Sequence, residues 1–306
     1  MSGGPSLQSR ALGAYLGLAV GDALGATVEF LTPNEIRYQY GELSDIVGGG
    51  WLKLKPGQVT DDTQMSLAMS AAIIEVGGWN LSRIADHWGR WLKSKPIDVG
   101  NTCRRGLTRY LRDGSLEAPF SDGDAGNGAL MRNLPAVLLA FRDPDLLDRY
   151  SLEQARVTHH HPFSDAATVC FARMMAALLS DEGTGDTEPQ RIKHNLRKTR
   201  DIAAALVEQH RQFRYQPYPK RATAYVIDTA QTVLHHFFST DSFESCLIAT
   251  VNQGGDADTT GAIAGMLAGA HYGVEAIPGR WLKRLDPATR RVIETHTPVL
   301  LAIESG

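Results

Sequence analysis

Apolar side chains recur at helical spacing along most of this chain. Near the N-terminus, Leu12, Tyr15, Leu16, Ala19 and Val20 follow the i, i+3, i+4 pattern of a helix with one apolar face. The same period predicts further helices over residues 63–76, 80–94, 101–112, 128–141, 164–180, 190–211, 222–239, 242–251, 259–272 and 286–302. Runs with the alternation of a β-strand are scarce. The pattern therefore predicts an all-α fold, a compact bundle of many helices.

Local signals mark a short helix and two loops between these segments. Thr32-Pro33-Asn34-Glu35 is a capping box with proline at the first helical position, which predicts a short helix to about Tyr40. Residues 180–189 are polar and acidic and contain two glycines and a proline, which favours a surface loop. Asp143-Pro144-Asp145 is read as a second loop.

Length and composition fit one globular domain over residues 1–306. The chain is 43% hydrophobic and 21% charged, which is ample for a sizeable core. Its net charge is −3, and lysines and arginines do not run together beyond pairs, so nucleic acid is not expected as a partner. The cysteines, Cys103, Cys170 and Cys246, lack paired spacing, which fits a reducing cytoplasm.

No membrane-spanning segment is expected from the sequence. The uncharged run over residues 259–274 is too short and too rich in small residues for a span. Residues 10–26 resemble a signal peptide, but one positive charge precedes the apolar stretch and Asp22 interrupts the cleavage-like part. We therefore expect residues 10–26 to form a helix of the folded protein.

Two short acidic clusters carry the strongest chemical signal. Thr60-Asp61-Asp62-Thr63 and Asp256-Ala257-Asp258-Thr259-Thr260 each precede an apolar, helix-like run. Either cluster alone could be an ordinary helix N-cap. If the two clusters converge, however, their carboxylates repel one another unless a cation lies between them. Carboxylate and hydroxyl oxygens are hard donors, so the clusters predict a divalent metal site with Mg²⁺ or Mn²⁺, and two ions suit so many carboxylates.

Other motifs suggest a ligand site less specifically. Residues 48–51, Gly-Gly-Gly-Trp, could be a flexible flap over a site or a plain turn. Residues 123–128 form a glycine-rich turn that could offer backbone N–H groups to a phosphate. His159 and His161 could contact a ligand or form a structural pair before a proline, and Asp98 could be catalytic or a simple helix cap.

These motifs together resemble the ADP-ribosylglycohydrolase family. The resemblance is carried by GDALGA at 21–26 with Glu29, the GGGW turn, QVTDDT at 58–63, GDAGNGALMR at 123–132, TH-x-HP at 158–162 and NQGGDADTTGAIAGMLAGAHYG at 252–273. It runs from about residue 10 to Trp281, and the motifs keep their order and spacing. The resemblance implies an all-α fold and hydrolysis of a glycosidic bond to ADP-ribose.

The resemblance also implies roles for individual residues. A site with two Mn²⁺ or Mg²⁺ ions would be held by Thr60, Asp61, Asp62, Asp256, Asp258 and Thr259. The reaction itself would involve Asp98, Asp62 and Asp256, with Asp98 as the acid–base or substrate-positioning group. ADP-ribose would be contacted by Glu29, Gly50, Asn101, Gly123, Asp124, Gly126, Asn127, Gly128, Met131 and His159. Two positions depart from the family pattern: His160 stands where asparagine is expected, and Asp122 where glutamate is expected.

Two segments, KSKPIDVGNTCRRG at 93–106 and VNQGGDADTTGA at 251–262, are most similar to family members that act on dinitrogenase reductase. This implies hydrolysis of ADP-ribosyl-arginine on that protein, which reactivates nitrogen fixation. It also implies regulation by a PII signalling protein and an ammonium channel, with a cytoplasmic location and reversible membrane association through these partners. Alternatives are hydrolysis of serine- or acetyl-linked ADP-ribose, a metal-dependent phosphohydrolase, and a module that binds ADP-ribose without cleaving it.

Overall fold

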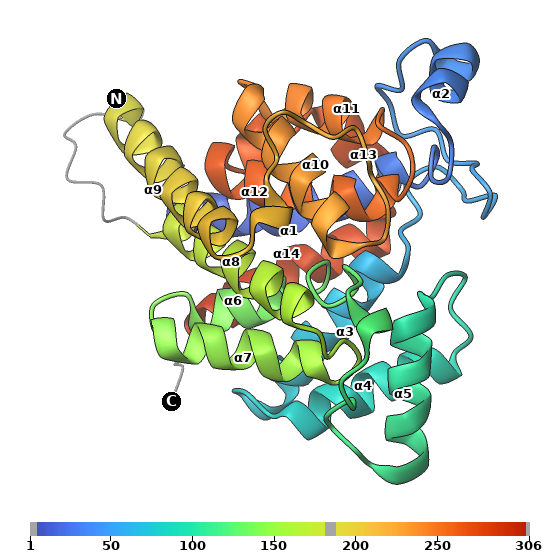
Figure 1. Cartoon of the computed structure of the whole chain (residues 1–306), viewed down its shortest axis with the longest axis vertical. Helices are drawn as coiled ribbons and strands as arrows, with labels where there is room; N and C mark the ends of the chain where they lie inside the picture. Colours follow the sequence, from blue (N-terminus) through green and yellow to red (C-terminus); the bar gives the residue numbers. More distant parts are fainter. Residues whose placement is uncertain (1–4, 181–187, 304–306) are drawn as a thin grey trace.

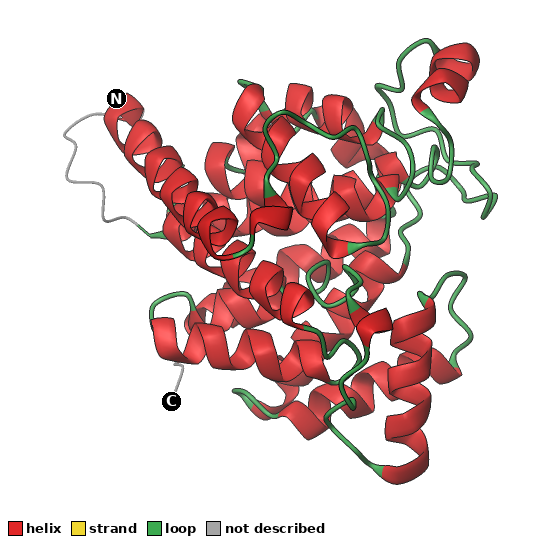
Figure 2. Cartoon of the chain, viewed as in Figure 1, coloured by secondary structure: helices red, strands yellow, loops and turns green. Residues whose placement is uncertain are grey.

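The computed structural model describes residues 5–180 and 188–303, and its regular structure is helical throughout these ranges (Figure 2). The α-helices are α1 (Leu7–Gly25), α2 (Pro33–Tyr40), α3 (Asp61–Val76), α4 (Leu81–Lys93), α5 (Asn101–Asp113), α6 (Leu134–Ala140), α7 (Pro144–Arg156), α8 (Pro162–Leu179), α9 (Glu188–Gln209), α10 (Val226–Ser239), α11 (Phe243–Val251), α12 (Ala257–Tyr272), α13 (Gly279–Arg284) and α14 (Pro287–Ala302). The all-α prediction is confirmed. Most of the predicted loop at 180–189 lies outside the described residues.

Helices α1 and α12 form the centre of the molecule and run antiparallel to each other (Figure 1). Almost every residue of both is buried, because neither has a polar face and other helices enclose them. The facing positions are Gly13 with Gly269, Gly17 with Gly265, Gly21 with Gly261 and Gly25 with Ala257. A Cβ atom on Gly21 would lie 2.0 Å from the carbonyl oxygen of Gly261, so the two backbones touch directly. This contact places the C-terminal end of α1 beside the N-terminal end of α12.

Two predicted helices begin later than their apolar pattern suggests. In the predicted helix 128–141, residues 128–132 form turns and only α6 is helical. Pro135 explains the interruption, because it has no N–H to donate and its ring clashes with the carbonyl four residues earlier. In the predicted helix 222–239, α10 starts at Val226, since Tyr225 pairs with Gly126 and the carbonyl of Ala222 accepts a hydrogen bond from Asp256 N at 2.7 Å.

The loop predicted at Asp143-Pro144-Asp145 is wrong, because these residues begin helix α7. The Asp143 side chain caps the helix by accepting hydrogen bonds from Asp145 N and Leu146 N, both at 3.0 Å. Pro144 occupies the first helical position, where its missing N–H costs nothing. The capping box predicted at Thr32 and Glu35 is present, with Thr32 N donating to Glu35 at 2.7 Å.

Helix α8 (Pro162–Leu179) is long and apolar enough, by length and composition alone, to cross a membrane. Charged Asp165 and Arg173 interrupt its apolar stretch, which is why the sequence did not single it out. Most of this helix is buried inside the fold, and it packs against α7, α9 and α12. We therefore interpret α8 as a core helix.

Candidate functional site

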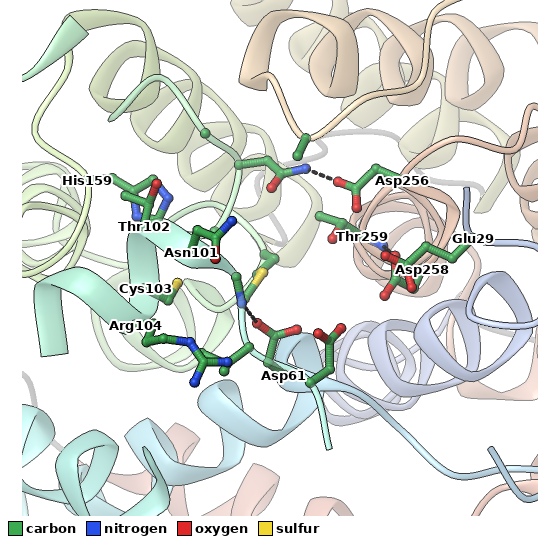
Figure 3. A pocket seen from close by; sticks show the side chains of 18 of the residues that line it. Glu29, Asp61, Asn101, Thr102, Cys103, Arg104, His159, Asp256, Asp258 and Thr259 are labelled. Atoms are coloured by element: carbon green, nitrogen blue, oxygen red, sulfur yellow. Dashed lines mark hydrogen bonds between the residues drawn. The ribbon is translucent and has the colours of Figure 1, made fainter. Parts of the chain in front are cut away.

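A cavity of about 540 Å³ opens where the N-terminal ends of α3, α5 and α12 meet. Figure 3 shows Glu29, Asp256, Asp258 and Thr259 on one side of it and Asn101, Thr102 and His159 on the other. Asp61 lies at the base of this view, and its carboxylate accepts a hydrogen bond from Gly100 N at 2.9 Å.

The two acidic clusters of the sequence meet beneath this cavity. Asp61 and Asp62 lie in the first turn of α3, and Asp256 and Asp258 flank the start of α12. Free N–H groups and the helix dipole favour carboxylates at both positions. Thr60 Oγ1 lies 3.3 Å from Asp62 Oδ2 and 3.4 Å from Asp258 Oδ2, so residues far apart in the sequence are in contact.

The partner threonine of the second cluster completes the contact. Thr259 Oγ1 lies 3.3 Å from Asp62 Oδ2. Thr60 and Asp62 are buried below the cavity, whereas Asp61, Asp256, Asp258 and Thr259 reach its wall. All six residues expected to hold metal therefore lie at the cavity wall or directly beneath it.

Asp22 lies under this cluster, and sequence reasoning assigned it no role. This carboxylate of α1 is fully buried and accepts hydrogen bonds from Thr60 N at 3.0 Å and Thr60 Oγ1 at 3.0 Å. It also accepts from Thr63 N at 3.2 Å and Thr63 Oγ1 at 2.5 Å. Asp22 thus fixes the first turn of α3 relative to α1. Its only sequence signal is its place in the GDALGA motif.

Glu29 and Asp98 complete the acidic side from two separate loops. Carboxylate oxygens of Glu29, Asp98 and Asp258 lie within 4.8 Å of one another, close enough to share one ion. Glu29 also accepts a hydrogen bond from Trp51 Nε1 at 2.5 Å. Trp51 therefore positions Glu29 at the cavity mouth, a role that its place at the end of the glycine-rich turn does not reveal.

Burial and mutual repulsion raise the pKa values of these carboxyl groups. Burial, opposed by the Trp51 hydrogen bond and reinforced by Asp256, raises the pKa of Glu29 to about 8. Burial and then the neighbouring Asp98 raise the pKa of Asp61 to about 7. Burial and the charges of nearby aspartates hold the pKa values of Asp62 and Asp258 well above their ordinary range. The cluster is therefore short of positive charge.

The residues present fit a divalent cation. Asp62 Oδ1 is buried and has no hydrogen-bond partner among the described residues, as an oxygen reserved for a metal would be. Within residues 5–180 and 188–303, no lysine or arginine forms a salt bridge with a carboxylate of this cluster. Hard oxygen donors match Mg²⁺ or Mn²⁺. The cluster could hold such ions through the threonine and aspartate oxygens already described.

The opposite wall is built from the glycine-rich turn and α5. Asn127 Nδ2 donates to Asp256 at 2.5 Å and to Thr229 Oγ1 at 2.9 Å, which ties this turn to the acidic side. The cavity wall includes Asn101, Gly126, Asn127, Gly128, Met131 and His159, all expected from the sequence to contact ligand, and also Cys103 and Arg104, which were not. Both follow Asn101 in α5, and their signals in the sequence are the helix start and their place in the segment 93–106.

His159 is held from behind by a buried cation. Arg132 is fully buried under the wall, and its guanidinium lies 4.1 Å from the ring centre of Trp88. Arg132 Nη2 donates to Thr158 Oγ1 at 2.8 Å, and Thr158 Oγ1 lies 2.8 Å from His159 Nδ1. Burial, followed by the charges of Arg132 and Arg105, holds the pKa of His159 well below its usual range. The imidazole is therefore neutral.

Several residues expected from the sequence to contact ligand do not line the cavity. Gly50 packs against the backbone, since a Cβ atom there would lie 2.3 Å from Ala26 O. Gly123 is exposed in a short 3₁₀ turn, and Asp124 forms a salt bridge with Arg105. Their roles toward a ligand stay predictions.

For His161 the sequence left two interpretations open, a ligand contact and a structural pair with His159, and the structure places this residue at the start of α8. Its side chain caps α8 by accepting a hydrogen bond from Phe163 N at 3.1 Å. His160 Nδ1 lies 2.6 Å from the carbonyl oxygen of Ala118.

Comparison with known proteins places these features in a family context. The family model described as ADP-ribosylglycohydrolase matches residues 4–304. A protein of Rhodospirillum rubrum named ADP-ribosyl-[dinitrogen reductase] glycohydrolase is 54% identical over 300 residues, which cover 98% of each chain. The ADP-ribosylarginine hydrolase Tri1 of Pseudomonas putida is 32% identical over 90% of this chain and 74% of its own length. A solved structure titled ADP-ribosylglycohydrolase-related protein complex superposes with a TM-score of 0.80 at 35% identity, covering 97% of this chain and 99% of that one.

Proposed function

This chain belongs to the ADP-ribosylglycohydrolase family of hydrolytic enzymes, and from that premise we propose that it releases ADP-ribose from a modified arginine of dinitrogenase reductase. The observation that carries the proposal is the 54% identity to the Rhodospirillum rubrum protein over 98% of both chains. The matched region spans the cavity-lining segments as well as the core. The expected consequence is reactivation of the nitrogenase iron protein and of nitrogen fixation.

The reaction would break the bond between the anomeric carbon of ADP-ribose and a guanidinium nitrogen, with water supplying the new hydroxyl group. The two-ion Mn²⁺ or Mg²⁺ site that we propose at Thr60, Asp61, Asp62, Asp256, Asp258 and Thr259 would bind ribose oxygens and promote ionisation of water. The chain's own carboxylates would stabilise the positive charge that develops at the anomeric carbon.

Asp98 is the residue that we propose for proton transfer. Guanidine leaves poorly unless it is protonated, so the reaction needs either an acid near the scissile nitrogen or retention of the guanidinium charge. Burial raises the pKa of Asp98, opposed by a hydrogen bond from the backbone N–H of Val99 and by the charge of Arg104, and Asp98 lies at the cavity wall. Glu29, beside it, and Asn101, Gly126, Asn127, Gly128, Met131 and His159 line the same cavity and would contact ADP-ribose.

The test is release of ADP-ribose from three substrates: modified dinitrogenase reductase, an ADP-ribosyl-arginine peptide and an ADP-ribosyl-serine peptide. We expect Mn²⁺-dependent release from both arginine-linked substrates, abolished by a chelator and restored by added metal. Release from the serine-linked peptide alone would overturn the proposal. Binding of ADP-ribose without turnover on any substrate would identify a binding module, and release of AMP or phosphate would indicate a phosphohydrolase.

A second candidate function is removal of ADP-ribose from arginines on other proteins. The 32% identity to the ADP-ribosylarginine hydrolase of Pseudomonas putida favours it. Rates on modified dinitrogenase reductase and on an unrelated arginine-modified protein would separate the two: equal rates would favour the general activity. Regulation by a PII protein and an ammonium channel, the cytoplasmic location and the single domain over 1–306 stay predictions of the sequence.

A further inference from the structure

His159 presents one ring nitrogen to the protein interior and the other to the cavity. Nδ1 lies 2.8 Å from Thr158 Oγ1. Nε2 has no hydrogen-bond partner among the described residues and lies on the side of the glycine-rich turn, where a Cβ atom on Gly126 or Gly128 would come within 3.1 Å of it. The cavity therefore meets the Nε2 edge of the ring.

The direction of the buried hydrogen bonds can be deduced from Arg132. A guanidinium group has donors only, so Thr158 Oγ1 must accept from Arg132 Nη2 at 2.8 Å. The hydroxyl group has a single proton, and that proton is left for a different neighbour. His159 Nδ1 is the strong acceptor within reach. Cys103 Sγ also approaches Thr158, but a thiol sulfur is a weak acceptor and already receives Arg132 Nη1 at 3.5 Å.

Arg132 cannot easily turn away from this arrangement. Its Nε donates to Gln154 Oε1 and its Nη2 to the carbonyl oxygen of Gln154, both at 2.9 Å, while its plane stacks over Trp88. The hydrogen bonds from Arg132 to Gln154 are strong, and they lie in a region from which water is excluded. The donor-to-acceptor direction of the hydrogen bonds that run from Arg132 through Thr158 to His159 is therefore set by groups that do not titrate near neutral pH.

We propose that Arg132 and Thr158 are positioning residues that hold His159 in the Nε2–H tautomer, so that the ring donates a hydrogen bond to an acceptor oxygen of bound ADP-ribose. The inference rests on the proposed function for the identity of the ligand. In a neutral imidazole whose Nδ1 accepts, the proton lies on Nε2. The wall beside Gly126 and Gly128 then offers a donor whose direction is fixed before the ligand arrives, which lowers the ordering cost of binding.

The tautomer can be measured directly by long-range ¹H–¹⁵N NMR of the Mg²⁺-loaded protein, since Mg²⁺ is diamagnetic. The His159 signals are assigned by their loss in His159→Gln. We expect a protonated nitrogen shift for Nε2 and an unprotonated shift for Nδ1 in the natural protein. In Thr158→Val, which keeps the shape but removes the hydroxyl group, we expect a mixture of the two tautomers, whereas Thr158→Ser should retain the single form.

Binding of ADP-ribose, followed by calorimetry, gives the second readout. We expect Thr158→Val to weaken binding about tenfold and Thr158→Ser to change it less than about twofold. The matched background is His159→Gln, because the glutamine amide can donate from the position of Nε2 without help from Thr158. If Thr158 acts through the tautomer, adding Thr158→Val to the His159→Gln variant should weaken ADP-ribose binding by less than about twofold.

Two results would overturn the inference. One is an Nδ1–H tautomer or a charged imidazole at His159 in the natural protein, a measurement that needs no variant to fold. The other is that Thr158→Val weakens ADP-ribose binding equally in the natural protein and in the His159→Gln variant, which would indicate that Thr158 acts through packing. Failure of the proposed function is distinguishable, because it would appear as no turnover or no ADP-ribose binding while the tautomer measurement still decides the inference.

Discussion

The two sides of the cavity solve the problem of buried charge in opposite ways. On one side, carboxylates from loops and helix starts far apart in the sequence face one another without a salt bridge to any described lysine or arginine. On the other, the buried cation of Arg132 has every partner supplied by the chain itself. The acidic side lacks a neutralising charge from the described residues, and we propose that divalent cations supply it. The side that contains His159 is organised before any ligand arrives.

The strongest test of this contrast removes an acidic ligand. Asp62→Asn keeps the side-chain shape but withdraws the charge and the unpartnered oxygen of this buried residue. We expect the rate of ADP-ribose release to fall by about a thousandfold, because metal-ion catalysis supplies several kcal/mol. Initial rates and Mn²⁺ binding by calorimetry would measure it. Asp148→Asn, in a surface salt bridge with Arg173, is the matched control. Normal Mn²⁺ binding by Asp62→Asn would contradict the assignment.

A substitution at Asp98 separates proton transfer from metal binding. Because Asp98 lies close to Glu29 and Asp258, it could serve either role. For the acid–base role we expect Asp98→Asn to lower kcat about a hundredfold while Mn²⁺ affinity changes little. Calorimetry and steady-state kinetics on the arginine-linked peptide would show the split. A parallel loss of Mn²⁺ affinity would make Asp98 a ligand, and near-normal turnover would remove it from the mechanism.

Asp22 tests whether the acidic side depends on support from below. In Asp22→Asn, an amide nitrogen must face hydrogen-bond donors of Thr60 or Thr63, so the first turn of α3 should shift. We expect Mn²⁺ affinity to fall about tenfold, as for groups that orient metal ligands. Thermal unfolding of the same variant would show whether the whole fold is affected. Unchanged affinity with lowered stability would limit Asp22 to a structural role.

The pH dependence of stability gives the smallest expected effect. Glu29 and Asp61, with pKa values raised to about 8 and about 7, keep protons in the metal-free folded state that the unfolded chain has released. Stability of the metal-free protein should therefore fall as the pH rises from about 6.5 to 8.5. Above about 6.5 the buried His236 and His271, whose pKa values burial lowers to about 4, contribute no further change.

Thermal unfolding at four pH values, with chelator or with Mn²⁺, would measure this trend. We expect the Tm of the chelated protein to drop by about 5 °C across the window and Mn²⁺ to restore most of the loss at the upper end. A Tm of the chelated protein that rises with pH would contradict the picture of an acidic side short of positive charge.

The fold class and most helices could be predicted from the chain, because apolar periodicity reports burial directly. The exceptions show where that signal ends. Thr32-Pro33 predicts a helix start because Glu35 completes a capping box, whereas Asp143-Pro144, which caps α7 with the same chemistry, lacks such a glutamate and resembles a loop. Before Pro135 the apolar pattern continues through residues 128–132, whose backbone forms turns instead of a helix.

The site was predictable in its residue types and only partly in its arrangement. The two acidic clusters could be recognised in the sequence by their paired carboxylates and hydroxyls at predicted helix starts. Asp22, Trp51 and the buried Arg132 did not, because each acts on a neighbour that only the fold brings within reach. No sequence pattern specifies that Trp51 reaches Glu29 or that Arg132 lies behind Thr158.

The direct backbone contact between α1 and α12 has a consequence for synthesis on the ribosome. Helix α1 is made before the other described helices, but its partner surface, residues 257–272, is translated only after most of them. Until then α1 exposes an apolar surface that has no complement in the nascent chain, a state that invites chaperone binding or aggregation. A ribosome that stalls before residue 257 releases a chain in which neither the central helix pair nor the second acidic cluster exists.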